Sequence, residues 1–289
     1  MLDSKLPCSV IVPTYNRAEL LRKTLHSLLV DTKTTTPFEV IVVDDGSSDH
    51  TFDIVKSYQK HGRIKYVFQK DEGYRVARAR NLALAIAEGE ICVFVDAGVV
   101  VCSRFVQAHL DVHHRRKSSV VIGRLLAIYS KSPENVACLE DCEADSVDAY
   151  VDGILANEKL GDPRQPCFDV CEGNMNELPM PWTLAWTANI SMPRAEILAV
   201  GAFDENYTSW GVEDLDLALS LYRRDLNFTF TPSAVAIHLP HPEQADRVAS
   251  NLANRQYLHR KFQMPETEIW LASPLWAHNH RLKSSAKRA

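Results

Sequence analysis

The chain has 289 residues, of which 46% are apolar, and a formal net charge of −5 at pH 7. This length holds one large domain or two modest ones with a sizeable core. The mildly acidic charge gives no general basic field, so we do not expect nucleic acid as a partner. We see no signal-peptide pattern and no apolar run near the roughly 18 residues of a membrane span, so we expect a soluble cytoplasmic protein.

The first hundred residues alternate apolar runs with helical patterns. Helices are predicted over 17–29, from the Asp-Gly turn to about residue 60, and over 75–87. Such alternation indicates crossover connections and a parallel sheet, and continuous apolar runs are typical of strands covered on both faces. The sequence therefore predicts an α/β fold. The four runs are CSVIV (8–12), EVIVV (39–43), IKYVF (64–68) and ICVFV (91–95).

A polar cluster follows each of these four runs. Because parallel strands gather their carboxyl ends along one edge, where open sheets bind ligands, we expect one carboxylate-rich cleft. Asp44 and Asp45 allow two interpretations, a helix-capping turn or recognition of a nucleobase N–H or ribose hydroxyl. We favour recognition, since one carboxylate suffices for a cap. The clusters begin at Pro13, Asp44, Asp71 and Asp96.

Beyond residue 101 the pattern becomes less regular. A strand is predicted over 119–129, a helix over 214–224, one or two short strands in the segment FTFTPSAVAIHLPH, and a final helix over 243–263 that stops before Pro265. Between these lies a polar, proline-bearing insert, 131–185, which we expect on the acceptor side of the site.

Seven cysteines are a high count for an intracellular protein. Cys8, Cys92 and Cys102 lie in or beside predicted strands and are expected in the core. The other four form two pairs with three intervening residues, a spacing that places each pair on one helix face. They could bind structural zinc, form disulfides or stay as unlinked thiols, and zinc suits an intracellular protein better than disulfides. These four are Cys138, Cys142, Cys167 and Cys171.

Three segments, VIVPTYNR, VIVVDDGSSDHT and ARARNLALAIAEGEICVFVDA, are similar to the nucleotide-binding half of family 2 glycosyltransferases of the GT-A type. A later stretch, running from WTANISMPRAEIL through WGVEDLDLALSLYRRDLNF to AIHLPH, resembles the C-terminal segment of galactosyltransferase-like and chondroitin-polymerase-like enzymes. The resemblance implies one GT-A domain with a Rossmann-like, mostly parallel sheet flanked by helices. Its parts would be a nucleotide-sugar half (1–105), an acceptor-binding and catalytic half (106–241) with a helical and irregular insert (131–185), and a C-terminal helix with a basic tail (242–289).

The resemblance assigns roles to residues of the first half. Asp45 would contact the uracil imide with Asp44 close by, and Arg75 or Arg80 would lie near the diphosphate, which suits the two parallel donors of a guanidinium. The alternative for Arg75, Arg78 and Arg80 is an exposed helix face. Three further residues would border the nucleobase, namely Pro13, Tyr15 and Arg17.

The chain departs from the family at its acidic motif. Where the family has Asp-x-Asp, this chain has Asp96-Ala97-Gly98, so the second carboxylate is missing. Asp96 would lie near the ribose of the nucleotide sugar or near the metal. Asp96 and His238, which aligns with a metal-binding histidine of the family, could still hold Mg²⁺ or Mn²⁺ together with water and the diphosphate. His241 lies three residues further on. Metal-independent transfer and a satisfied histidine at the end of a strand remain the alternatives.

The resemblance places the catalytic acids in Trp210-Gly211-Val212-Glu213-Asp214. Asp214 would be the general base and Glu213 would hold the acceptor hydroxyls, because inverting transfer needs an acceptor deprotonated as it attacks in line. The alternative is that both acids simply favour the first turn of a helix. Trp210 could stack on a sugar or pack in the core. Trp182 and Trp186 could do either, with the core favoured for Trp186.

The predicted function is that of an inverting glycosyltransferase that moves a sugar from a UDP-sugar to a saccharide, small molecule or peptide. A catalytically weak or silent nucleotide-sugar or glycan-binding protein is the alternative, and Gly98 favours it. A nucleotidyltransferase would need a glycine-rich basic loop after the first strand, and PTYNRAEL is not such a loop.

Overall fold

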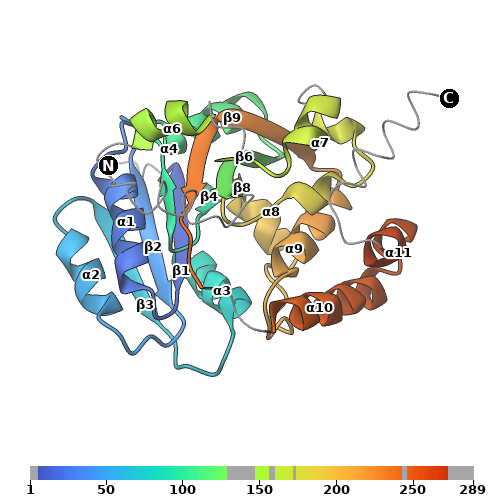
Figure 1. The fold of residues 1–289 in the computed structure, drawn as a ribbon, viewed down its shortest axis with the longest axis horizontal. Coiled ribbons are helices and arrows are strands. Elements are labelled where there is room, and N and C mark those ends of the chain that lie inside the picture. The colour runs from blue at the N-terminus through green and yellow to red at the C-terminus, as the bar shows by residue number, and fades with distance from the viewer. Residues whose placement is uncertain (1–5, 129–146, 156–159, 172–173, 243–245, 273–289) are drawn as a thin grey trace.

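The computed structural model describes residues 6–128, 147–155, 160–171, 174–242 and 246–272, and shows one curled sheet flanked by helices (Figure 1). The strands are β1 (Cys8–Thr14), β2 (Phe38–Asp44), β3 (Arg63–Phe68), β4 (Ile91–Phe94), β5 (Val99–Val101), β6 (Ser119–Ile128), β7 (Leu160–Gly161), β8 (Ile190–Pro193) and β9 (Asn227–His238). The α-helices are α1 (Ala18–Leu29), α2 (Thr51–Tyr58), α3 (Val76–Ile86), α4 (Phe105–Arg115), α6 (Val147–Leu155), α7 (Gln165–Val170), α8 (Arg194–Ala199), α9 (Glu213–Tyr222), α10 (Arg247–Phe262) and α11 (Pro265–Ala272), with short 3₁₀ turns at η2 (Met175–Glu177) and η3 (Pro181–Leu184).

The sheet has the strand order β3-β2-β1-β4-β8-β6-β9-β5, and β7 pairs with β6. Strands β3, β2, β1 and β4 are all parallel, as the alternating pattern predicted. The direction reverses at β8, which runs antiparallel to both β4 and β6, while β9 is parallel to β6 and β5 antiparallel to β9. The predicted α/β class is therefore confirmed, and its parallel half brings four carboxyl-terminal strand ends to one edge.

Burial follows the sequence pattern of the strands. All seven residues of β1 are buried, and only Phe38 of β2 is not, as expected for strands covered on both faces. Edge strand β3 is exposed at both ends. Cys8, Cys92 and Cys102 are buried as predicted.

Several elements of the second half of the chain differ from prediction. The expected one or two short strands form the single twelve-residue strand β9, which is irregular opposite Gly123 and Arg124 of β6. The final helix is confirmed as α10, but a further helix, α11, starts at Pro265. Proline stops a preceding helix and also suits the first turn of a new one, so the sequence prediction took account of only one of its effects. Helix α4 was not predicted.

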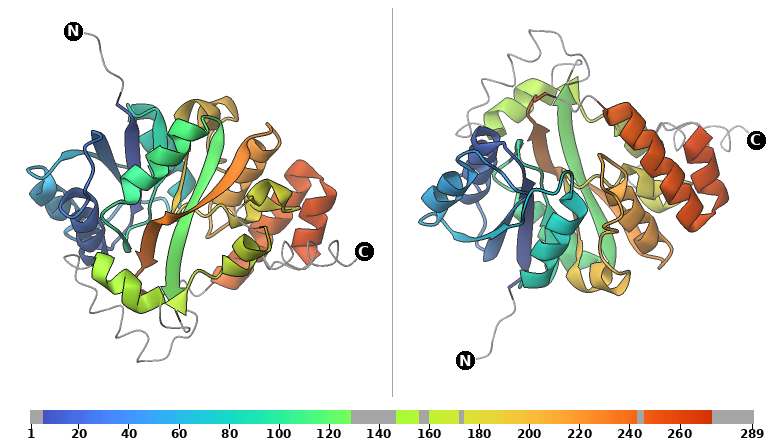
Figure 2. Two further views of the ribbon diagram at one scale, coloured as in Figure 1. Left: turned by 90° about the horizontal axis from the view of Figure 1, so that it is seen from above. Right: turned by 90° about the horizontal axis from the view of Figure 1, so that it is seen from below.

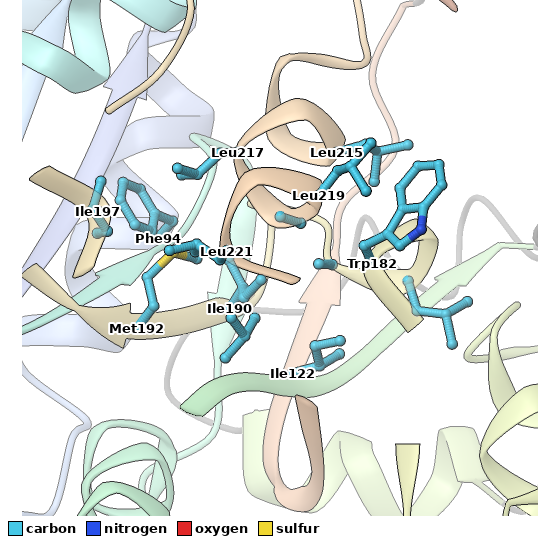
Figure 3. Close-up of a cluster of buried hydrophobic side chains, with 14 of the residues drawn as sticks. Phe94, Ile122, Trp182, Ile190, Met192, Ile197, Leu215, Leu217, Leu219 and Leu221 are labelled. Carbon is cyan, nitrogen blue, oxygen red and sulfur yellow. The ribbon is translucent and has the colours of Figure 1, made fainter. Parts of the chain in front are cut away.

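Helix α9 is fixed by a hydrophobic cluster drawn from both halves of the chain (Figure 3). Four leucines of α9 pack there with side chains of β4, β6, β8 and η3. Burying each leucine contributes about 2 kcal/mol, so the cluster strongly resists rotation or sliding of α9. The axis of α9 is thus fixed by the core. The leucines are Leu215, Leu217, Leu219 and Leu221, and their neighbours include Phe94, Ile122, Trp182, Ile190 and Met192.

Charged contacts hold α10 against α9, next to which it lies in Figures 1 and 2. Lys261 of α10 donates to Asp204 at 2.7 Å and to Asp216 of α9 at 2.8 Å. Asp216 also accepts a 3.0 Å hydrogen bond from Tyr207.

Among the described residues, no helix is both long and apolar enough to cross a membrane.

A buried ion pair ties part of the 131–185 insert to the sheet. Arg164 and Asp162 are fully buried as side chains and lie 2.8 Å apart. Arg164 also donates to the carbonyl oxygens of Leu184, at 2.8 Å, and Gly123, at 2.9 Å. Two buried charges are tolerated only with such complete pairing. The Asp162–Arg164 segment of the insert is therefore held against β6 and against η3.

Candidate functional site

The ends of β1, β2 and β3 meet at one edge of the sheet. The amide of Asp45 donates to the carbonyl of Thr14 at 2.9 Å, and the amide of Gln69 donates to the carbonyl of Asp44 at 2.9 Å. These bonds extend the strand register by one residue and bring the residues that follow each strand together. Beside them, the Tyr15 hydroxyl donates to Asp71 at 2.9 Å.

The two adjacent aspartates at the end of β2 have different environments. Asp44 accepts from the amides of Gly46, at 3.1 Å, and Ser47, at 2.7 Å, and from the Tyr66 hydroxyl at 2.7 Å. These contacts match the turn-forming alternative for Asp44. Gly46 has φ +96°, and a Cβ there would collide with the Asp71 backbone, so this turn requires glycine.

Asp45 faces the segment that leads into α3. It accepts a 3.0 Å bond from the amide of Arg75 and a bond from the side-chain amide of Gln69. Desolvation, with a smaller contribution from the charge of Asp71, raises the pKa of Asp45, although both hydrogen bonds oppose the rise. Asp44 therefore bonds within its own turn, whereas Asp45 bonds to Gln69 and Arg75 in the segment that follows β3.

Arg80 lies in the interior, so the exposed-face alternative is wrong for this arginine. Its side chain is 3% exposed and donates to Glu213 at 2.8 Å and to Asp96 at 3.1 Å. The guanidinium also lies 5.4 Å from the Phe203 ring centre. Desolvation opposes its charge, but Asp96 and Glu213 outweigh this and raise the pKa of Arg80. Arg80 thereby links the end of β4 to the start of α9.

The other two arginines of this segment lie nearer the surface. The Arg78 side chain is 42% exposed and pairs with Glu72 at 3.0 Å, so the helix-face alternative holds for it. Arg75 precedes α3, and one of its guanidinium nitrogens donates to the carbonyl of Tyr74 at 2.9 Å. Tyr74 lies close to Glu213, and desolvation together with that charge raises the pKa of Tyr74.

Glu213 and Asp214 form the first turn of α9, as the sequence predicted. Glu213 is buried against Arg80, whereas Asp214 accepts from the amide of Leu215 at 2.8 Å and, more weakly, from the amide of Thr187 at 3.4 Å. Desolvation and the neighbouring Glu213 charge raise the pKa of Asp214 to about 7, against the opposing charge of Arg80. A carboxylate with that pKa is well matched to accepting a proton near neutral pH.

Gly98 is fixed by backbone geometry as well as by its missing side chain. It has φ +100°, a conformation that side chains rarely adopt, and a Cβ there would lie 3.4 Å from Leu20. Its amide donates to the Thr24 hydroxyl at 2.9 Å, and its carbonyl accepts from the Leu239 amide at 2.8 Å. A carboxylate at this position would therefore strain the backbone that supports it.

The pairing of β5 with β9 brings both histidines to the Asp96 loop. His238 pairs with Val99, and the His238 and His241 rings are centred 5.2 Å apart. Desolvation lowers the pKa of His238, and the nearby charge of Asp96 opposes this. Among the described residues there is no group of three or more histidine, cysteine or acidic side chains that could hold a metal. Any cation here would need substrate oxygens to complete its coordination.

Arg17, predicted beside the nucleobase, contacts His241. The distance from its Nη1 to His241 Nε2 is 3.0 Å, and His241 Nδ1 lies 2.9 Å from the Pro242 carbonyl oxygen. The ring nitrogens thus have distinct roles, with Nδ1–H donating and Nε2 accepting from Arg17. Pro13, the other expected neighbour of the base, is buried within β1.

The tryptophans divide between core and surface. Trp182 is fully buried and meets Trp270 edge-on at 5.6 Å. Trp186 is partly buried, donates to the Thr183 carbonyl at 3.1 Å and lies 4.8 Å from the Arg164 guanidinium. These two therefore pack in the interior. Trp210 is partly exposed beside the acid pair.

The zinc prediction concerns residues that the structure covers only in part. Cys167 and Cys171 are buried at α7, and the Cys171 thiol donates to the Phe168 carbonyl at 3.4 Å. Cys138 and Cys142 lie outside the described residues, so the two pairs cannot be compared.

An open cavity of about 700 Å³ lies elsewhere, between α10 and α11. Its lining contains none of the predicted site residues. We place the candidate site at the Asp45–Arg80–Asp214 edge because the charged groups with altered pKa values gather there. The cavity is lined by His259, Arg260, Gln263, Met264, Pro265 and Glu268.

Sequence reasoning missed several contributors to the site. Gln69 directly follows β3, so the strand-end rule that identified Asp71 two residues later could have found it. Phe203 and Thr187 offered no signal, because one contributes a ring face and the other a backbone amide.

Comparison with known proteins agrees with this arrangement. A protein-family model described as glycosyl transferase family 2 matches residues 9–154, which is half of the chain. The validoxylamine A glucosyltransferase of Streptomyces hygroscopicus subsp. jinggangensis is 38% identical over 84% of this chain and 58% of its own length. The chondroitin synthase of Escherichia coli is 29% identical over 89% of this chain and 38% of its own length. The chain thus spans little more than half of the first relative.

Solved structures share the fold. Staphylococcus aureus TarS 1–349 in complex with UDP-GlcNAc has a TM-score of 0.61 and 18% identity, over 93% of this chain and 76% of that chain. The mannosyltransferase PcManGT of Pyrobaculum calidifontis, in complex with GDP-Man and Mn²⁺, has a TM-score of 0.59 and 18% identity, over 96% and 73%. The predicted GT-A fold is confirmed, and the chain belongs to glycosyl transferase family 2.

Proposed function

We propose that this chain transfers a sugar from a UDP-sugar to an acceptor nucleophile with inversion of configuration. The observation that carries the proposal is the continuous charged path from Asp96 through Arg80 to the Glu213–Asp214 pair. This path connects the sheet edge at which α/β sheets bind ligands to Asp214, a carboxylate whose pKa is raised to about 7. The relative named validoxylamine A glucosyltransferase and the neighbour bound to UDP-GlcNAc support this class of donor.

In this proposal Asp214 acts as the general base. Its oxygens are oriented by the amides of Leu215 and Thr187, and it takes the proton from the acceptor as that group attacks the anomeric carbon. Glu213, oriented by Arg80, orders the acceptor hydroxyls. Much of the rate would come from holding both reactants in line.

The donor lies along the strand ends in the same proposal. Asp45 and Tyr15 contact the uracil nucleoside, with Asp44 shaping the turn beneath it. Arg17 and Arg75 would contact the diphosphate, because Arg80 is already committed to two carboxylates. Trp210 contacts the transferred sugar or the acceptor.

A divalent cation fits this site only with the help of the substrate. Asp96 and His238 would hold it, and diphosphate oxygens and water would complete the coordination, as is usual for Mg²⁺. Bound there, the cation would neutralise negative charge on the leaving diphosphate. The neighbour solved with Mn²⁺ supports this possibility.

The test is UDP release from a panel of UDP-sugars, with candidate acceptors present or absent, in Mn²⁺, Mg²⁺ or EDTA. We expect acceptor-dependent release with at least one donor. Asp214→Asn should reduce it by at least about 10²-fold, as expected for loss of a general base, while UDP affinity stays near that of the wild type. Transfer by Asp214→Asn at the wild-type rate would refute the base assignment.

A silent sugar-nucleotide binder is the second candidate, and Gly98 favours it. That protein would bind UDP or a UDP-sugar in calorimetry and release no UDP under any metal condition. The same panel therefore separates the two functions.

A further inference from the structure

Helix α10 presents a row of three side chains to the turn that precedes α9. Arg247, Asn251 and Asn254 recur at intervals of four and three residues and so share one helix face. The Arg247 guanidinium lies 3.9 Å from the centre of the Trp210 ring. Asn251 lies close to Gly211: a Cβ added to Gly211 would be 3.2 Å from the side-chain nitrogen of Asn251. This face of α10 therefore follows the turn closely.

Asn254 makes the most extensive contact with this turn. Its side-chain nitrogen donates to the carbonyls of Ser209 at 3.1 Å, Trp210 at 3.3 Å and Gly211 at 2.8 Å. Its side-chain oxygen accepts from the Ser209 hydroxyl at 3.3 Å, and the residue is 8% exposed. One buried amide group thus fixes the direction of three consecutive peptide carbonyls.

The turn formed by residues 209–212 is strained at its last residue, Val212. Val212 has φ +82° and ψ −18°, is buried, and directly precedes the first residue of α9. A β-branched residue in this left-handed region is a genuine outlier. Gly211 before it has φ +91°, so two successive residues reverse the chain just ahead of Glu213. Such a conformation persists only where its surroundings enforce it, and Asn254 bonds the three residues directly before Val212.

We propose that Asn254 is a positioning residue for sugar transfer, which holds the 209–212 turn so that Glu213 meets Arg80 and Asp214 faces the acceptor. The inference rests on the proposed role of the acid pair. The α9 leucines fix the helix axis, but the direction of its first turn depends on how the chain enters it. Asn254 acts on that entry from a helix that lies more than 150 residues beyond the nucleotide-binding strands.

The test compares two substitutions with a control on the same helix. Asn254→Asp keeps the shape but sets a carboxylate oxygen against three carbonyl oxygens, and Asn254→Ala removes the contact. Ser250→Ala is the control, because the Ser250 hydroxyl donates to Asp246, the residue directly before α10, at 3.0 Å and not to the 209–212 turn. We expect kcat to fall at least about tenfold in both Asn254 variants, since small misplacements of reacting groups cost that much. The KM for donor and the UDP affinity should stay within about twofold.

A substitution at Val212 distinguishes a loss of positioning by Asn254 from a general loss of folding. Val212→Gly relieves the strain, since glycine adopts positive φ readily, so Val212→Gly combined with Asn254→Ala should recover part of the lost kcat. Wild-type kcat in Asn254→Asp, or kcat and UDP affinity lost together without recovery by Val212→Gly, would overturn the proposal.

Hydrogen exchange of the 207–216 peptide gives a readout that needs no activity. Exchange there should quicken in Asn254→Ala and not in Ser250→Ala. Unchanged exchange in Asn254→Ala would overturn the positioning role whatever the kinetics show. An inactive wild type with faster exchange in the variant would instead overturn the proposed function and leave the control of the turn by Asn254 standing.

Discussion

Asp214→Asn is expected to stabilise the fold at alkaline pH while removing the proposed base. Above pH 7 the wild type holds two adjacent carboxylates at the start of α9, and only Glu213 has an arginine partner. The asparagine keeps the shape, and its oxygen can still accept from Leu215. It loses only the long 3.4 Å contact from Thr187.

The magnitude follows from the pKa. The folded-state pKa of Asp214 rises from 3.8 to about 7, a shift of about three units at about 1.4 kcal/mol each, which sets a ceiling of about 4 kcal/mol. Between these pKa values the folded state binds more protons than the unfolded state, so wild-type stability falls as pH rises through this window. Losing the weak Thr187 bond costs about 1 kcal/mol. The variant should therefore gain about 3 kcal/mol over the wild type at pH 8 and almost nothing at pH 4.

Urea unfolding of both proteins at several pH values between 4 and 8 measures this difference. Asp204→Asn is the control, because Asp204 accepts from Lys261 at 2.7 Å and from Tyr257 at 3.0 Å, and although desolvation opposes them, these bonds lower the pKa of Asp204. That substitution should lower stability at pH 8. The reasoning is refuted if Asp214→Asn is no more stable than the wild type at pH 8, or if its advantage does not change with pH.

Two further predictions concern other buried charges and rings. Arg80→Gln leaves Glu213 buried without its cation and should cost about 3 kcal/mol in urea unfolding. Because Arg80 lowers the pKa of Asp214, the acid limb of kcat/KM should also move to higher pH in that variant, and an unmoved limb would contradict the coupling. Burial lowers the pKa of His109 to about 4 and of His113 to about 3. Unfolded histidine binds protons below about pH 6.5, so stability should fall between pH 6.5 and 5 by about 2 kcal/mol for each histidine. Replacing His109 with glutamine should flatten that profile in pH-dependent melting.

Much of the framework could be read from local patterns. The continuous apolar runs of β1 and β2 identified them as strands covered on both faces, and the structure buries nearly every residue in them. The leucines of α9 lay at helical spacing. The position of Asp45 and Asp96 at one sheet edge followed from strand ends alone. Each of these features depends on a few consecutive residues and on the repeat of a strand or helix.

The partnerships within the site could not be read in this way. Arg80 lies in a helix rich in alanine and arginine, and nothing in that helix distinguishes it from Arg78, whose side chain is largely open to solvent. Its partner Glu213 is 133 residues away, and the two meet only because α3 and α9 pack toward the end of β4. Arg17 likewise meets His241, a residue 224 positions away that no local pattern connects to it.

The sequence by itself determined the fold class, the strand ends that gather the carboxylates and the acidic start of α9, because periodicity and turn residues act over short distances. Only the tertiary structure decided which charges neutralise one another and which carboxylate is left with a raised pKa. It also showed that Val212 is strained and that Asn254 supports the strained turn. These properties depend on burial and on approach within about 3 Å between side chains far apart along the chain, and a one-dimensional pattern contains neither.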